Sequence, residues 1–166
     1  MIIEELHNER RITNRPSWDQ YFMQIARDVA TRSTCIKRQV GAIAINPTTK
    51  QILATGYNGA VIGSKHCSEL GCLRKDIPSG QRFELCRAVH AESNLICQAA
   101  RHGIKLDGAW VYCTHKPCYW CLKQLINTGV VKVIYEQDYP HDQLIQELLD
   151  QKLIELVKYT PDTAEK

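Results

Sequence analysis

The chain contains no long run of apolar residues. Its first fifteen residues carry charges among their apolar side chains, so they lack the continuous apolar core of a secretory signal. No later stretch approaches the roughly 20 apolar residues that a membrane-spanning helix needs. Internal repeats, low-complexity segments and a recognisable domain boundary are missing as well. These absences predict a single domain over residues 1–166, in the cytoplasm and without a membrane partner.

A strong charge of either sign is also lacking. The net charge of +3 is mild, and 44% hydrophobic with 23% charged residues is typical of a globular protein. Proteins that bind single-stranded nucleic acid combine a basic groove with stacking aromatic residues. The basic residues of the central region are instead scattered without aromatic residues between them: Lys37, Arg38, Lys65, Arg74, Lys75, Arg82 and Arg87. We therefore expect no nucleic-acid partner, although the charge is compatible with a phosphorylated small molecule.

Cysteine, by contrast, is abundant. The chain has eight, and without an export signal they indicate metal binding rather than disulfides. His90 and the two cysteines that follow Pro117, Cys118 and Cys121, provide three zinc ligands. A structural zinc is closed by four protein ligands, whereas three leave one tetrahedral position for water. The spacing therefore predicts a catalytic zinc, with both sulfurs on the first turn of a helix that begins near Pro117.

Glu92 lies two residues after the histidine and is not needed as a ligand. A carboxylate beside a zinc-activated water can take a proton from the water and later protonate a leaving amine. Each fragment alone is ambiguous, because Cys-x-x-Cys also occurs in redox pairs and zinc knuckles, and His-x-Glu occurs by chance. Together, in this order, they form the known signature of zinc-dependent nucleobase deaminases. The sequence thus predicts a hydrolytic deaminase with Glu92 as the catalytic acid and base.

Hydrophobic periodicity predicts alternating strands and helices. Ser17 and Gln20 resemble a capping box that opens a helix with apolar residues from Trp18 to Val29. Further helices are expected at 89–101, 119–128 and 142–150, and strands at 40–45, 51–55, 110–113, 130–135 and 153–157. The first two strands form a hairpin, and the later alternation implies parallel pairing. We expect an α/β fold of three layers, α/β/α, with a mixed five-stranded sheet.

The chain resembles the deoxycytidylate (dCMP) deaminases of the cytidine deaminase-like superfamily, from about Trp18 to Val157. Gly56-Tyr57-Asn58-Gly59 is the element that distinguishes this subfamily from its relatives. The other matching elements are Cys35 with Gln39-Val40-Gly41-Ala42, His66-Cys67, Gly71-Cys72, His90-Ala91-Glu92-Ser93-Asn94, Thr114-His115-Lys116-Pro117-Cys118, Tyr135 and Tyr139. The resemblance implies hydrolysis of dCMP to dUMP and ammonia.

The same resemblance gives two residues a role in binding the nucleotide. Asn58 would hydrogen-bond the substrate and Tyr139 would line its pocket; from the sequence alone they would be a turn residue and a surface aromatic. Family members form hexamers activated by dCTP with Mg²⁺ and inhibited by dTTP, which implies a homo-oligomer with these effectors. Val61 and Ile62, however, depart from the usual sequence of a loop that has proline at position 61 in relatives and contributes to nucleotide regulation in family members.

Residues 60–87 form a cysteine-rich insertion that is too long for a plain connection. Members of the family often carry a second, structural zinc, and the resemblance implies ligands from this insertion and from the residue before the first strand: Cys35, Cys67, Cys72 and Cys86. His66 could replace one of these thiolates. The alternative is that all four are free thiols in the interior. Cys97 and Cys113 fall within a helix and a strand, and we expect both in the core.

Three other functions fit the motif. A related deaminase acting on another cytosine or purine nucleoside or nucleotide would keep every catalytic residue. A deaminase of single-stranded nucleic acid would use the same metal site on an extruded base. A zinc module that only binds partners would not need Glu92, so the presence of this carboxylate argues against it.

Overall fold

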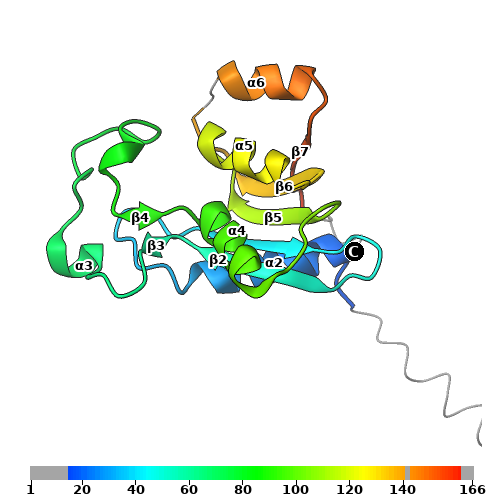
Figure 1. Ribbon diagram of the computed structural model, residues 1–166, viewed down its shortest axis with the longest axis horizontal. Helices are drawn as coiled ribbons and strands as arrows, with labels where there is room; N and C mark the ends of the chain where they lie inside the picture. Colours follow the sequence, from blue (N-terminus) through cyan, green and yellow to red (C-terminus); the bar gives the residue numbers. More distant parts are fainter. Residues whose placement is uncertain (1–14, 141–142, 162–166) are drawn as a thin grey trace, which may run out of the picture.

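A mixed five-stranded sheet lies at the centre of the computed structural model, which describes residues 15–140 and 143–161 (Figure 1). The strand order is β2-β1-β5-β6-β7. β1 pairs antiparallel with β2 and with β5, whereas β5, β6 and β7 are parallel. The strands are β1 (Gly41–Ile45), β2 (Ile52–Tyr57), β5 (Trp110–His115), β6 (Lys132–Gln137) and β7 (Glu155–Lys158). The predicted mixed sheet is confirmed.

Helix α2 (Trp18–Ala30) covers one face of the sheet. Its capping box is present as predicted: the Ser17 hydroxyl accepts from the Gln20 backbone N–H, and the Gln20 side chain accepts from the Ser17 N–H. Phe22 and Met23 are buried and pack in one cluster with Ile43 of β1. Period-2 alternation along β1 sends its isoleucines to this side, so they form the core beneath α2.

Three helices cover the other face of the sheet: α4 (Ala91–His102), α5 (Tyr119–Asn127) and α6 (Gln143–Asp150). They share a core cluster with the alanines of β1, and Leu95 of α4 and Leu122 of α5 are fully buried in it. Apolar residues of these helices thus face the sheet at helical spacing. Helices on both faces complete the predicted three layers (Figure 1).

The cysteine-rich insertion begins and ends in a small sheet of its own. β3 (Gly59–Ala60) pairs antiparallel with β4 (Ala88–Val89), and between them lie α3 (Cys67–Leu70) and the 3₁₀ turn η1 (Phe83–Leu85). Figure 1 shows the insertion extending beyond the main sheet at the side of β3 and β4. Lys37 ties it to the domain, because its Nζ donates to the carbonyls of Arg74 and Ile77 at 2.8 and 2.6 Å.

Several predicted boundaries were wrong by a few residues. The helix expected at 89–101 starts at Ala91, because Val89 pairs with Gly59 in β4. The start expected at residue 142 lies outside the described ranges and stays a prediction, and the rest of that helix is present as expected, from Gln143 to Asp150. Cys97 was expected in the core and is exposed, because positions 91, 95 and 99 of α4 face the sheet instead. Within the described ranges, no helix is long and apolar enough to cross a membrane.

Candidate active site

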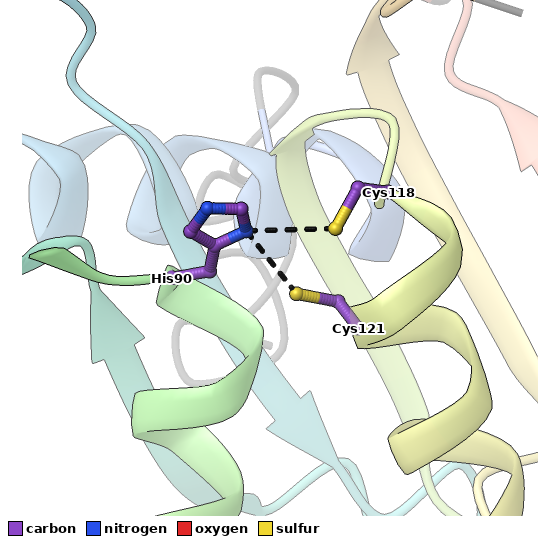
Figure 2. A group of neighbouring side chains, drawn as sticks. All are labelled: His90, Cys118 and Cys121. Carbon is purple, nitrogen blue, oxygen red and sulfur yellow. Dashed lines mark hydrogen bonds between the residues drawn. The ribbon is translucent and has the colours of Figure 1, made fainter. Parts of the chain in front are cut away.

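The starts of α4 and α5 bring the three predicted ligands together. His90 is the N-cap of α4, Cys118 is the N-cap of α5, and Cys121 lies one turn further on. His90 Nδ1 is 3.5 Å from Cys118 Sγ and 3.4 Å from Cys121 Sγ (Figure 2). Since both helices begin at one end of the sheet, chain segments 28 residues apart meet at a single point.

The three donor atoms fit a zinc ion. Their ligand atoms all lie within 4.8 Å of one another, and they form the only such group of three or more among the described residues. Tetrahedral zinc with its usual bond lengths to nitrogen and sulfur separates these two ligands by about 3.6 Å, close to the two distances observed here. An imidazole with two thiols is also a donor set that suits this borderline-soft ion.

The contacts among these three side chains also shift their pKa values. A hydrogen bond with the Cys121 thiol, assisted by His90, lowers the pKa of Cys118. The hydrogen bond to Cys118 raises the pKa of His90 despite its burial. The same contact with Cys118, together with burial, raises the pKa of Cys121. A lowered pKa at Cys118 favours its thiolate, which is the form that binds a zinc ion.

Glu92 lies beside this group but is not part of it. Its side chain is buried, and burial, followed by the nearby Cys118, raises the pKa of its carboxyl. The thiol of Cys113, from β5, lies 3.8 Å from its Oε1. Cys113 is buried as predicted, but it also contacts the predicted catalytic carboxyl, and this contact could not be foreseen from the sequence. A carboxyl with a raised pKa can both accept and return a proton near neutral pH.

Side chains of α4 hold the helix against the edge strand β2. Asn94 Nδ2 donates to the Tyr57 carbonyl at 2.7 Å, and Gln98 Oε1 accepts from the Thr55 N–H at 2.7 Å. Gly56 lies between these contacts, where an added Cβ would be only 2.2 Å from the Ala91 carbonyl oxygen. Only glycine permits this close approach, so the packing on β2 sets the distance between the sheet and the end of α4 that carries His90 and Glu92.

A second contact joins the two helices behind the sulfurs. The Ser93 hydroxyl donates to Gln124 Oε1 at 2.7 Å and lies 3.7 Å from Cys121 Sγ. The ring of Phe83, which belongs to the insertion, meets the His90 ring edge-on, with 5.1 Å between the ring centroids. Such contacts orient metal ligands, because a side chain held on several sides keeps one rotamer.

A pocket of about 100 Å³ opens over these residues. By the same measure a water molecule needs only ~10–15 Å³, so the space suits a ligand the size of a pyrimidine ring. Glu92, His90 and Cys118 lie in its wall, and Lys37, Arg38 and Arg74 supply positive charge. A wider groove of about 930 Å³, lined in part by Tyr139 and Trp120, adjoins it.

The model of the cytidine and deoxycytidylate deaminase zinc-binding region matches residues 16–137, which include β1, β2, β5 and β6, the starts of α4 and α5, and the insertion. The chain belongs to this family. Its relatives include the ComE operon protein 2 of Bacillus subtilis, 41% identical over 82% of this chain and 68% of that protein. The deoxycytidylate deaminase of Schizosaccharomyces pombe is 36% identical over 89% of this chain. The match spans only 45% of the length of that yeast protein.

A solved structure of similar size supports the same family. The dCMP deaminase of the cyanophage S-TIM5, in complex with dCMP and dUMP, has a TM-score of 0.71 and is 30% identical. The similarity covers 88% of this chain and 99% of the phage chain. The predicted cytidine deaminase-like fold is thereby confirmed.

Asn58, which the family resemblance singles out, lies in the pocket wall but is already engaged by the protein. Its Oδ1 accepts from the Ser33 hydroxyl at 2.6 Å and from the Val40 N–H at 2.8 Å, and its Nδ2 donates to the Arg38 carbonyl at 2.8 Å. One N–H of Nδ2 has no further partner among these contacts and can serve a ligand. Tyr139 also lines the pocket, with Arg38 over its ring at 5.1 Å.

The four cysteines assigned to a second zinc of this family lie near one another. Burial, followed by the charges of Cys35, Cys72 and Cys86, raises the pKa of the Cys67 thiol. Their sulfurs do not form a group at ligand distance, since the only such group in the described ranges is that of His90. His66, the possible substitute, is the exposed N-cap of α3.

Proposed function

We propose that the protein is a zinc-dependent deaminase that hydrolyses dCMP to dUMP and ammonia. The observation that carries this proposal is a buried carboxyl, Glu92, beside a His-Cys-Cys group at the wall of a ring-sized pocket. Membership of the cytidine and deoxycytidylate deaminase family supports the reaction type. The phage relative of known structure, with dCMP and dUMP bound, supports the choice of nucleotide.

In this proposal His90, Cys118 and Cys121 hold the catalytic ion. Zinc, when bound, supplies a Lewis acid that makes water a nucleophile near neutral pH. Cys118 and Cys121 enter as thiolates at the start of α5, where the helix dipole favours negative charge. Ser93 orients Cys121, and Phe83 limits the motion of the His90 ring.

Glu92 moves the protons. It takes one from the attacking water and delivers it to N3 of the cytosine ring while the oxygen adds to C4. Glu92 then takes the second proton from the hydroxyl now on C4 and delivers it to the amino group, so that the C4–N bond breaks and ammonia leaves. One water is consumed and one dUMP is formed, which balances the reaction. Because Glu92 is buried away from bulk solvent, its proton passes to the substrate and not to water.

Family membership is the main support for the second metal site, for the residues that bind the nucleotide and for the assembly of subunits. We propose that residues 1–166 act as one deaminase domain and that Cys35, Cys67, Cys72 and Cys86 of the insertion and its neighbourhood hold a second, structural zinc. Asn58, with its spare N–H, and Tyr139 bind the nucleotide. The protein works in the cytoplasm as a homo-oligomer, of hexamer size by analogy with the family. Exposed Ile62 on the insertion supports subunit contact at this site.

Nucleotides are the proposed regulators of the protein. dCTP with Mg²⁺ and dTTP are the effectors to test, although Val61 and Ile62 depart from the usual loop. Light scattering with and without dCTP, run beside rate curves on dCMP, tests both oligomer and activation. A monomer whose rate on dCMP does not change when dCTP is added would contradict this part of the proposal and leave the proposed chemistry untouched.

A substrate panel tests the main proposal. Ammonia release is compared for dCMP, dCTP, deoxycytidine and single-stranded DNA, with the same zinc-loaded protein. We expect dCMP to give the highest kcat/KM. Preference for deoxycytidine would favour a nucleoside deaminase, and release from DNA alone would favour a nucleic-acid deaminase; either result would overturn the proposed substrate.

A further inference from the structure

The lining of the active-site pocket carries an unbalanced positive charge. Among its lining residues are four cationic side chains, Lys37, Arg38, Arg74 and Lys116, and a single carboxyl, that of Glu92. A cytosine ring is neutral and does not need this charge. The pocket is therefore built for a ligand that is anionic away from the ring.

Arg74 is the unusual member of this set. It is only 8% exposed, yet the described residues place no carboxylate within ion-pair distance of it, and its Nε has no hydrogen-bond partner. Its guanidinium lies over the ring of Phe83, 4.8 Å from the centroid. A buried charge without an anion is unfavourable, so proteins place one only where a ligand or a role requires it.

The surroundings of Arg74 keep its position fixed. The Lys37 ammonium donates to the Arg74 carbonyl at 2.8 Å, which locks the backbone, and Phe83 packs against both Arg74 and His90. Arg74 and the metal-site histidine thus line the pocket in contact with the same aromatic ring. A second guanidinium, of Arg38, lies in the wall nearby, where it donates to Ser79 Oγ at 3.4 Å and stacks over Tyr139.

We propose that Arg74 is the anchor for the 5′-phosphate of the substrate, with Arg38 and Ser79 completing the anion subsite. A guanidinium presents parallel N–H donors that match two phosphate oxygens, and burial strengthens this pairing. Specificity for the nucleotide over the nucleoside then follows, because deoxycytidine leaves the buried charge unmatched. This inference rests on the proposed dCMP deaminase function, since it identifies which part of the chain recognises the phosphate.

The subsite also has a consequence for stability. If Arg74 is kept for a ligand, its charge destabilises the unliganded protein, and its replacement by an apolar side chain of similar length relieves that cost. Arg74→Met keeps the packing on Phe83 and is expected to unfold at the same temperature as the wild type or higher. If Arg74 had only a structural role, Arg74→Met would unfold at a lower temperature than the wild type.

The experiment uses zinc-loaded wild type, Arg74→Met, Arg74→Lys and the control Lys75→Gln, which removes an exposed charge from the neighbouring position. The ratio of kcat/KM for dCMP to that for deoxycytidine is measured for each. We expect Arg74→Met to lower this ratio by about 30-fold or more, Arg74→Lys to lower it less, and Lys75→Gln to leave it unchanged. Arg74→Lys keeps the positive charge and removes the guanidinium, so it tests the paired N–H donors separately from the charge.

A second measurement does not depend on turnover. Inorganic phosphate is expected to raise the thermal midpoint of the wild type and of Lys75→Gln, but not of Arg74→Met. An unchanged substrate ratio in both Arg74 variants, equal phosphate responses in all four proteins, or a lower midpoint of unliganded Arg74→Met would overturn the subsite. A wild type that does not prefer dCMP would instead overturn the proposed function, and the phosphate response would still decide whether Arg74 binds an anion.

Discussion

Gly56→Ala tests whether the packing of α4 on β2 sets the geometry of the active site. The new Cβ would lie 2.2 Å from the Ala91 carbonyl oxygen and 2.5 Å from the Leu95 nitrogen, whereas ordinary contacts begin at 3.4 Å. Since the atoms met are backbone atoms, the start of α4 has to move away by about 1 Å in a close-packed interior. Overpacking of this kind costs about 1–3 kcal/mol of stability.

The same movement carries His90 and Glu92 with it, because they stand at the N-cap and in the first turn of α4. A misplacement of about 1 Å at a reacting centre can lower the rate by ~100-fold. We therefore expect Gly56→Ala to lose both stability and kcat on dCMP. Thermal unfolding and steady-state rates, taken at matched zinc content, measure the two effects.

Gly103→Ala is the matched control. Gly103 ends the same helix at φ 66°, with nothing within 4 Å of an added Cβ. An alanine there is strained by about 1–2 kcal/mol, but it lies at the far end of α4 and leaves the metal site in place. The reasoning would be refuted by a Gly56→Ala protein with wild-type midpoint and kcat, or by equal losses of kcat in both variants.

Two further substitutions test the metal sites. Cys118→Ala should lose zinc and activity together, because one of three ligands disappears; a zinc-loaded, fully active variant, seen by metal analysis beside the rate assay, would contradict the ligand assignment. Cys67→Ser should lower the thermal midpoint much more than the rate of the protein that stays folded, since a structural ion contributes folding free energy. Native mass spectrometry should count two zinc ions per chain. A single ion, together with an unchanged midpoint for Cys67→Ser, would mean that the four cysteines proposed for the second zinc are free thiols.

The sequence predicted the layers of the fold because each strand and helix carries its own periodicity. Ser17 and Gln20 form a local motif, so the start of α2 could be read directly. Val89 could not be placed correctly, because its pairing partner, Gly59, lies across the whole insertion. The inner structure of residues 60–87 was likewise not predictable, since it depends on long-range ties such as the hydrogen bonds of Lys37.

The predicted site residues show the same division. His90, Cys118 and Cys121 were found because zinc demands particular residue types at a particular spacing, and the structure brings them together. Gly56 belongs to the Gly-Tyr-Asn-Gly element of the family resemblance, but nothing in the sequence indicated its contact with α4. Arg74 carried no signal at all, because an arginine in a long loop looks ordinary until its neighbours in space are known. Their importance arises from close approach and from burial, which the sequence does not record.

Glu92→Gln tests the central claim most directly. The amide keeps the size of the carboxyl but cannot carry protons, and the three metal ligands are untouched. We measure ammonia release from dCMP and zinc content on the same preparations of wild type and variant. The account predicts wild-type zinc content with nearly all deamination lost; wild-type zinc content with activity preserved within a few fold would contradict it.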